Sequence, residues 1–165
     1  MQRLKVNLGG VHSASLQLGW VDPPYSTQLP AQPSAQFSLQ RSYYKGRQQL
    51  FAPLRLKPQE EVTVQLDLVC EKPLQYVMLQ DYRAAGMEAV PNSSRSWDYA
   101  QREDRDDRSV FFFTSLRAGR HTVRYNQRAE TPGSFRVLPA QMELMYQPDL
   151  RARGGSDAVE ISGGP

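Results

Sequence analysis

The densest group of side chains that could do chemistry is an acidic cluster in which carboxylates alternate with arginines. Its acids are Glu103, Asp104, Asp106 and Asp107, and carboxylate oxygens are ligands that calcium prefers. Arginines interrupt them at positions 102, 105 and 108, and the glycine that lets an EF-hand loop turn is missing. The pattern favours a mixed-sign loop whose acids bind turn amides and arginines, with a metal site as the alternative.

Nucleophilic catalysis would need a general base beside a serine, cysteine or threonine. His12 lies in a Gly/Ser-rich turn, and His121 alternates in phase with Val123 and Tyr125, which places it at the edge of a strand's core face. Cys70 ends an apolar alternation, so we expect an inert thiol near a strand end. The sequence has no G-x-S-x-G, P-loop or G-x-G-x-x-G motif. We therefore expect a non-enzymatic binding module without a cofactor.

The composition limits the class of molecule further. A chain of 165 residues, 39% hydrophobic and 22% charged, suits one principal globular core. No apolar run approaches the ~20 residues that span a bilayer, and the N-terminus lacks the apolar region of a signal peptide. The formal net charge is +3, with arginines scattered among acids, which is a weak nucleic-acid signal. We expect contact with neither nucleic acid nor membrane by this segment.

The elements that position these residues are short strands. From Glu61 to Val69 the apolar positions 62, 64, 66 and 68 share one face and polar residues the other, which predicts a half-buried antiparallel strand. Similar runs, mostly bounded by Gly, Pro, Asn or Asp, cover residues 3–8, 13–18, 36–43, 75–80, 109–114, 121–127, 134–138 and 141–147. The pattern predicts an all-β, antiparallel, Ig-like β-sandwich of seven or eight strands. At most one short helical turn, near Asp81 to Met87 and ended by Gly86, interrupts it.

A proline-rich stretch divides the chain. Val21 to Pro33 contains four prolines, which deprive a strand of ladder donors, so it is interpreted as a linker or long loop. We expect a partial N-terminal segment at 1–35, whose two strands need a partner, and a sandwich domain at 36–150. The paired glycines and small polar residues of 151–165 indicate a flexible tail.

The closing strand of the domain is the least ordinary. Pro139 breaks the preceding strand, and the run from Gln141 to Gln147 then alternates with Tyr146 in phase with the apolar positions 142 and 144. Met145 lies alone on the polar face. It is either an ordinary exposed side chain or a contact with another domain, to which an adaptable thioether is suited.

A set of short motifs, from Arg41-Ser-Tyr-Tyr44 to Met145-Tyr146, resembles in its order the C-terminal domain of bacterial α2-macroglobulins, the counterpart of the receptor-binding domain of the eukaryotic proteins. The resemblance covers about Phe37 to Arg153, and it implies a macroglobulin-like β-sandwich. Residues 1–35 would then include the end of the preceding CUB-like domain. The similarity is carried by Arg41-Ser-Tyr-Tyr44, Tyr76-Val-Met-Leu-Gln-Asp81, Ala85-Gly-Met-Glu88, Arg105-Asp-Asp-Arg108, Phe111-Phe-Phe113, Ala118-Gly119, Tyr125, Arg128-Ala-Glu-Thr-Pro-Gly133, Phe135, Leu138-Pro-Ala140 and Met145-Tyr146.

The resemblance implies a part of a protease trap. Such proteins are large, periplasmic and membrane-anchored through an N-terminal part, and cleavage of a bait region by a target protease triggers their collapse. Their C-terminal domain packs on the thioester domain and shields it, a role that maps onto Met145 and Tyr146. In this chain Cys70 is followed by Glu-Lys-Pro without the glutamine of a thioester. We therefore expect it to shield and contact neighbouring domains of the same polypeptide, but not to capture proteases covalently.

Two other functions remain open from the sequence. One is a generic Ig-like adhesion or spacer module of the cell envelope, with no thioester partner to protect. The other is a small metal-dependent enzyme that uses the acidic cluster, which calcium titration would test. A Cys-x-Glu-Gln stretch in an upstream helical domain would favour the protease trap over the spacer.

Overall fold

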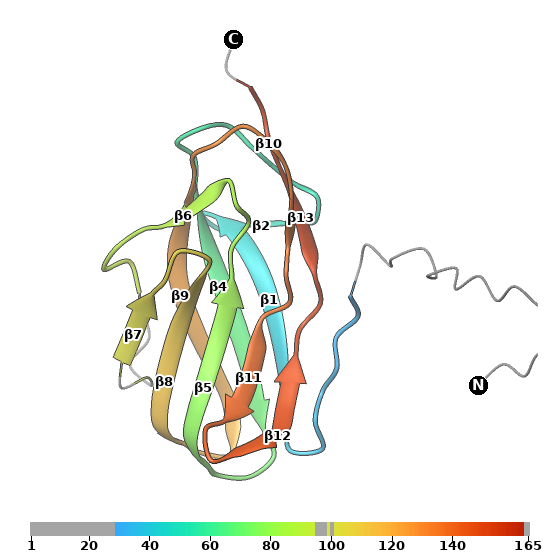
Figure 1. Cartoon of the computed structure of the whole chain (residues 1–165), viewed down its shortest axis with the longest axis vertical. Coiled ribbons are helices and arrows are strands. Elements are labelled where there is room, and N and C mark those ends of the chain that lie inside the picture. Colours follow the sequence, from blue (N-terminus) through green and yellow to red (C-terminus); the bar gives the residue numbers. More distant parts are fainter. Residues whose placement is uncertain (1–28, 95–98, 100, 164–165) are drawn as a thin grey trace, which may run out of the picture.

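The computed structural model describes residues 29–94, 99 and 101–163, and these fold as a β-sandwich (Figure 1). No helix occurs in this described part of the chain, so none there could span a membrane. The prediction of an all-β sandwich is confirmed. The described residues contain thirteen strands where seven or eight were predicted, because short edge segments also pair: β1 (Phe37–Lys45), β2 (Gln48–Leu50), β3 (Leu54–Leu56), β4 (Glu61–Cys70), β5 (Leu74–Tyr82), β6 (Met87–Ala89), β7 (Gln101–Asp104), β8 (Arg108–Leu116), β9 (Gly119–Ala129), β10 (Gly133–Val137), β11 (Gln141–Leu144), β12 (Gln147–Arg153) and β13 (Asp157–Ile161).

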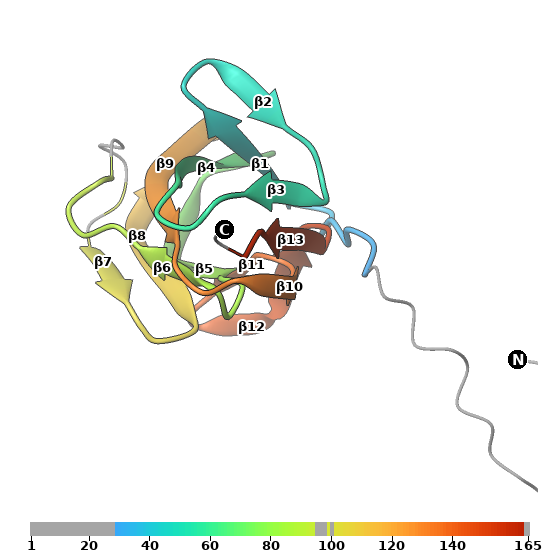
Figure 2. The ribbon, with the colours of Figure 1, turned by 90° about the horizontal axis from the view of Figure 1, so that it is seen from above.

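Two five-stranded sheets form the layers of the sandwich, as the view from above shows (Figure 2). Their strand orders are β2-β1-β4-β9-β6 and β12-β11-β5-β8-β7, and all of these pairings are antiparallel. A third sheet, β10-β13-β3, closes one end and contains a parallel pairing between β13 and β3. Loops β4–β5 and β8–β9 lie together at the other end, beside the β11–β12 turn (Figure 1).

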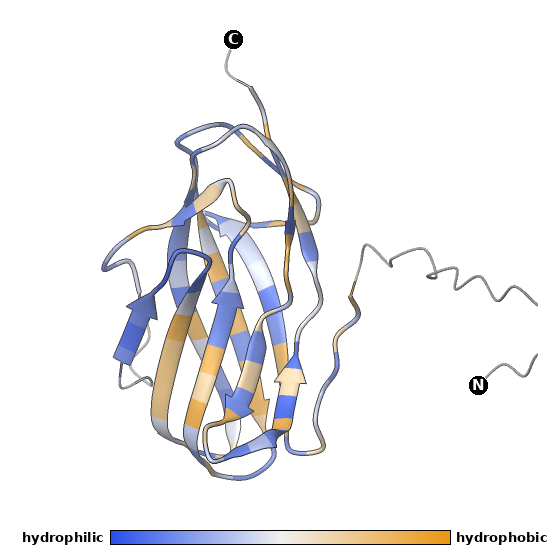
Figure 3. Cartoon of the chain, viewed as in Figure 1, coloured by the Kyte–Doolittle hydropathy of each residue, from blue (hydrophilic) through white to orange (hydrophobic). Residues whose placement is uncertain are grey.

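The core lies between the two large sheets, where period-two alternation places apolar side chains. Val62, Val64, Leu66 and Leu68 of β4 are buried, and Phe111 and Phe113 of β8 face them from the second layer. Hydrophobic bands therefore cross the central strands, whereas β7 is hydrophilic (Figure 3). Burial of each such side chain contributes about 1.5–3 kcal/mol. Phe111 and Phe113 thus belong to the core, as the sequence predicted.

The one short helical turn that the sequence allowed near Asp81 to Met87 does not form. Strand β5 continues to Tyr82, a turn follows at Ala85 and Gly86, and β6 begins at Met87. Gly86 is needed for close approach, since a Cβ there would lie 2.4 Å from the Phe135 ring and 2.7 Å from the Thr131 carbonyl. The Gly86 carbonyl also accepts hydrogen bonds from the amides of residues 130 and 131.

The prediction of a flexible tail from Arg151 onward is wrong for residues 151–161. They complete β12 and form β13, in which Val159 and Ile161 are buried. These two residues alternate with exposed Glu160, a strand pattern that the neighbouring glycines obscured in the sequence. The folded body therefore extends beyond the predicted boundary at residue 150.

The segment that leads into β1 follows the C-terminal segment. Gln32 and Arg153 exchange two backbone hydrogen bonds of 2.8 and 2.9 Å. The amide of Leu29 donates to the Ser156 hydroxyl at 2.7 Å, and Ser156 N–H donates back to the Leu29 carbonyl. The two strands predicted at 3–8 and 13–18, and most of the proline-rich linker, lie outside the described residues.

Candidate functional site

Met145 and Tyr146 form the turn between β11 and β12. The prediction that they belong to one continuous strand is wrong. Leu144 pairs with Gln147, so the connection has only these two residues. Met145 is 46% exposed and Tyr146 is 76% exposed. Tyr146 therefore does not share the apolar face of Met142 and Leu144, with which it is in phase in the sequence, because the strand ends before it.

The residues of this turn are not those that a two-residue hairpin favours. Such turns favour Asn-Gly or Asp-Gly, because their backbone requires positive φ. Met145 and Tyr146 have negative φ, and the β11–β12 register shifts between Glu143 and Leu144. Irregular pairing of this kind re-aims side chains next to functional sites. Two large apolar residues exposed together on a turn indicate a contact surface.

Tyr76 of β5 completes the site. Its ring packs edge-on against that of Tyr146, with centroids 5.2 Å apart and an interplanar angle of 83°. Its carbonyl accepts a hydrogen bond of 2.8 Å from the amide of Met145, and its side chain is 45% exposed. We call Tyr76, Met145 and Tyr146 the tyrosine tip.

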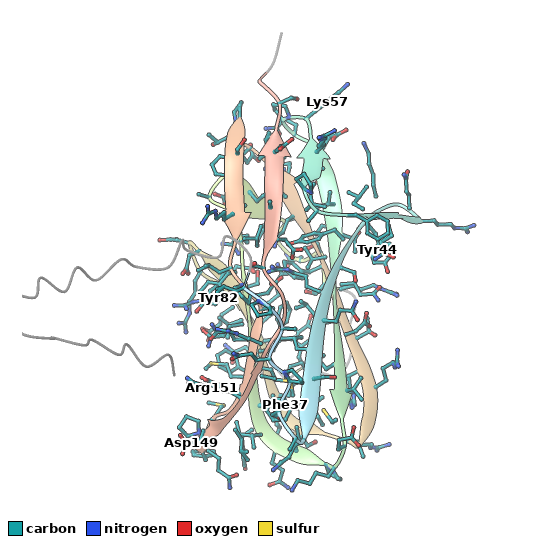
Figure 4. The ribbon with its side chains drawn as sticks, turned by 90° about the vertical axis from the view of Figure 1, so that its right-hand side faces the viewer. Phe37, Tyr44, Lys57, Tyr82, Asp149 and Arg151 are labelled. Atoms are coloured by element: carbon teal, nitrogen blue, oxygen red, sulfur yellow. The ribbon has the colours of Figure 1, made fainter. Side chains whose placement is uncertain are left out.

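A shallow groove adjoins the tyrosine tip. Leu74 and Leu144 contribute apolar surface to it, and the remaining lining is mostly amide side chains with one cation from the β4–β5 loop: Gln36, Lys72, Pro73, Gln75 and Gln147. Asp149 and Arg151 of β12 extend this end of the molecule, opposite Lys57 (Figure 4). The tip thus presents an apolar surface with a polar rim, the composition of a protein interface.

A buried polar network joins the sheets of the sandwich that carries the tip. Arg41 of β1 donates to Asp81 of β5 at 2.7 Å and to Asp157 of β13 at 2.9 Å. The Tyr125 hydroxyl donates to the other oxygen of Asp81 at 2.5 Å and accepts from Gln127 at 2.8 Å. All three sheets are therefore linked through these side chains. Arg41, Asp81 and Tyr125 each lie in a motif that carries the resemblance, but the sequence gives no reason for their presence there.

Burial and charge determine the ionisation of this network. Burial opposes the charge of Arg41, but Tyr43, Asp81 and Asp157 around it raise its pKa above the usual value. Burial raises the pKa of Tyr125, and the adjacent Asp81 carboxylate raises it further. The pKa of buried Tyr43 is also raised, mainly by burial. The network therefore holds a charged Arg41 guanidinium beside the neutral phenols of Tyr43 and Tyr125, which suits a structural role.

The acidic cluster is a hairpin between β7 and β8 held by arginines. Asp104 pairs with Arg102 at 2.9 Å and accepts from the Ser109 hydroxyl at 2.6 Å. Glu103 pairs with Arg105 at 3.3 Å, and Asp107 with Arg108 at 3.4 Å. Arg83 also donates to the loop carbonyls of Arg105 and Asp106. Within the described ranges, no three metal-ligating side chains, Asp106 included, gather into a cation site.

The remaining candidates are also structural. Cys70 is buried at the end of β4, as predicted, and burial raises the pKa of its thiol. His121 lies at the half-buried edge of β9, with Nε2 2.8 Å from the Arg117 carbonyl. Tyr76, by contrast, was missed as a site residue, because nothing in the sequence pattern places it beside Tyr146.

Comparison with known proteins identifies relatives of this fold. Residues 37–149 match the family model described as the bacterial α2-macroglobulin MG10 domain. An α2-macroglobulin of Xylella fastidiosa Temecula1 is 27% identical over 148 residues, which cover 77% of this chain and 9% of the relative. A Nostoc sp. PCC 7120 α2-macroglobulin homologue is 27% identical over 108 residues, or 59% of this chain and 6% of the relative. The chain therefore spans less than a tenth of these curated relatives.

Solved structures of α2-macroglobulins contain a domain of similar fold. A Salmonella α2-macroglobulin reacted with methylamine matches with a TM-score of 0.73 and 25% identity, over 84% of this chain and 10% of the other. An Escherichia coli α2-macroglobulin in its native form, spanning domain MG7 to the C-terminus, matches with a TM-score of 0.72 and 22% identity, over 81% of this chain and 24% of the other. The latter likeness shows the shared sandwich fold.

Proposed function

The chain belongs to the bacterial α2-macroglobulin family through its MG10 domain, and we propose that it is a non-catalytic C-terminal part of a protease-trapping inhibitor. In this proposal the sandwich packs on the thioester domain of the same polypeptide and shields it. The full-length protein, anchored in the cell envelope and facing the periplasm, meets the target protease through other domains. Cleavage of the bait region then moves the domain away from the thioester.

The observation that carries the shielding proposal is the exposure of the tyrosine tip. Met145 and Tyr146 are 46% and 76% exposed on a turn that rests on an extensively paired sheet. Exposing large apolar side chains to water in this way is unfavourable, and covering them with a partner lowers the free energy. The tip is therefore suited to contact another domain.

The chemistry of a thioester explains why such a cover is useful. An activated acyl group persists only where water and amines are excluded, and apolar side chains exclude both. The thioether of Met145 adapts to an irregular surface, and Tyr146 offers an aromatic face with a polar hydroxyl at its rim.

Methylamine, a small amine that reacts with exposed thioesters, tests the proposal in the full-length protein. Replacing both Met145 and Tyr146 with alanine should speed loss of the thioester about tenfold, the factor expected when one buried apolar contact is lost. Thiol release after methylamine addition, followed against time, measures the rate.

The matched control is Phe51→Ala. Phe51 is also 76% exposed but lies in the β2–β3 loop of the opposite layer. Its replacement should leave the rate unchanged. An equal methylamine rate in wild type and the Met145/Tyr146 double variant would contradict the shielding role.

A further inference from the structure

We propose that Tyr76 is the positioning residue of the tyrosine tip: it fixes the turn and the ring through which Met145 and Tyr146 make their contact. The inference rests on the proposed shielding function and adds a residue to it. Tyr76 lies on a different strand from the turn, some 70 residues earlier in the chain. It thereby ties the turn between β11 and β12 to β5, the neighbouring strand of the same sheet.

The backbone of Tyr76 is the first observation. Its φ is 53°, in the left-handed region that a residue with a bulky side chain rarely adopts. Strain of this kind persists only where the surrounding structure imposes it, and it is concentrated at functional sites. Within β5, the pairing with β8 continues on both sides, from Gln75 with Ser115 to Val77 with Phe113. The strain is therefore local to one residue.

The strained residue coincides with a change in the alternation of two strands. In β5 the buried positions Leu74 and Val77 are three residues apart instead of two, so both intervening residues are exposed. In β8 the same skip separates Phe113 from Leu116. Tyr76 thus departs from the regular alternation of β5, and its side chain lies on the outside of the sandwich.

The two contacts of Tyr76 with the turn form the third observation. Its carbonyl binds the amide of Met145, and its ring supports the ring of Tyr146 from the edge. Both contacts restrain the turn from outside the β11–β12 hairpin. The hydrogen bond fixes the backbone, and the ring contact selects the orientation of Tyr146.

A pair of substitutions separates the ring from the backbone. Tyr76→Gly retains the positive φ at no steric cost and removes the ring, whereas Tyr76→Phe retains the ring and removes only the hydroxyl. In the full-length protein, the glycine variant should react with methylamine about two- to tenfold faster than wild type, the range expected for loss of one edge-to-face aromatic contact. The phenylalanine variant should react at the wild-type rate.

Non-additivity distinguishes positioning from a general loosening of the domain. Because Tyr76 acts through Tyr146, Tyr76→Gly should cause no further acceleration in a Tyr146→Ala background. If Tyr76→Gly reacts at the wild-type rate while Tyr146→Ala is faster, the positioning role is overturned and the shielding function stands. An additive acceleration would also overturn it.

A structural measurement keeps the inference testable if Tyr146→Ala has no effect, which would defeat the shielding function itself. In NMR spectra of the 165-residue chain, the ring protons of Tyr146 should move toward random-coil shifts in the glycine variant and stay in place in the phenylalanine variant. Unchanged Tyr146 shifts in the glycine variant would show that Tyr76 does not position this ring.

Discussion

The guanidinium of Arg41 donates to the carboxylate of Asp81 across the interior of the sandwich, with both side chains shielded from solvent. Arg41 belongs to one large sheet and Asp81 to the other, so the ion pair connects the two layers. Asp157 binds the same guanidinium from the third sheet. One arginine therefore determines how three sheets meet.

Loss of the Asp81 charge should strongly destabilise the domain. Asp81→Asn leaves the buried Arg41 with only Asp157 as a charged partner, and removal of one partner of a buried ion pair costs about 3 kcal/mol or more. Urea unfolding followed by circular dichroism measures the free energy of unfolding. The exposed pair of Arg55 and Glu160 provides the control, since Glu160→Gln should change this free energy by less than about 1 kcal/mol. Equal effects of the two substitutions would contradict the structural role of the network.

Stability should fall at alkaline pH. The folded-state pKa of Tyr125 is raised above its ordinary value of 10.0 by burial and by Asp81. Above pH 10 the unfolded chain therefore releases the phenolic proton while the folded chain keeps it. The contribution is complete below pH 10 and decreases by about 1.4 kcal/mol per pH unit above it. Urea unfolding between pH 8 and 11 should show this decrease. Tyr125→Phe should make it shallower, and a parallel profile would contradict the assignment.

Gly86→Ala should destabilise the fold by about 1–3 kcal/mol, the range for overpacking a well-packed site. The added methyl group would collide with the Phe135 ring and the Thr131 carbonyl. Gly163→Ala is the control, since a Cβ there meets nothing within 4 Å. Thermal unfolding of both variants measures the difference in stability. A melting temperature of Gly86→Ala as high as that of Gly163→Ala would count against the close approach of Gly86 to Phe135 and Thr131.

The Cys70 thiol should be unreactive in the folded protein. It is buried, and its pKa is raised by that burial, so little thiolate is available. Ellman's reagent should label it slowly in buffer and at once in denaturant. Rapid labelling without denaturant would show that the end of β4 opens readily.

The sequence predicted the fold class well because the strands obey simple alternation. The face shared by Val62, Val64, Leu66 and Leu68 is visible from residue types alone and is the face that the core buries. The break at Pro139 also separates β10 from β11 as expected. These features depend on local pattern, which a single sequence contains.

What the sequence could not supply were relationships between distant residues. Nothing near Tyr76 indicates that its carbonyl will bind Met145, and the strict alternation of residues 141–147 conceals the turn at 145 and 146. Strand β13 was missed for a similar reason, because glycines outweighed the alternation of Val159 and Ile161. Arg41, Asp81 and Tyr125 reveal their network only when three strands come together.

The hydrogen bonds between Gln32 and Arg153 protect a strand edge against aggregation. Strand β12 is the last of its sheet, and an uncovered edge offers unpaired amides and carbonyls to any other chain. Gln32, which precedes the first strand, covers part of that edge through its bridge to Arg153. A shorter protein beginning at Phe37 would leave it open, with strand-to-strand aggregation as the result.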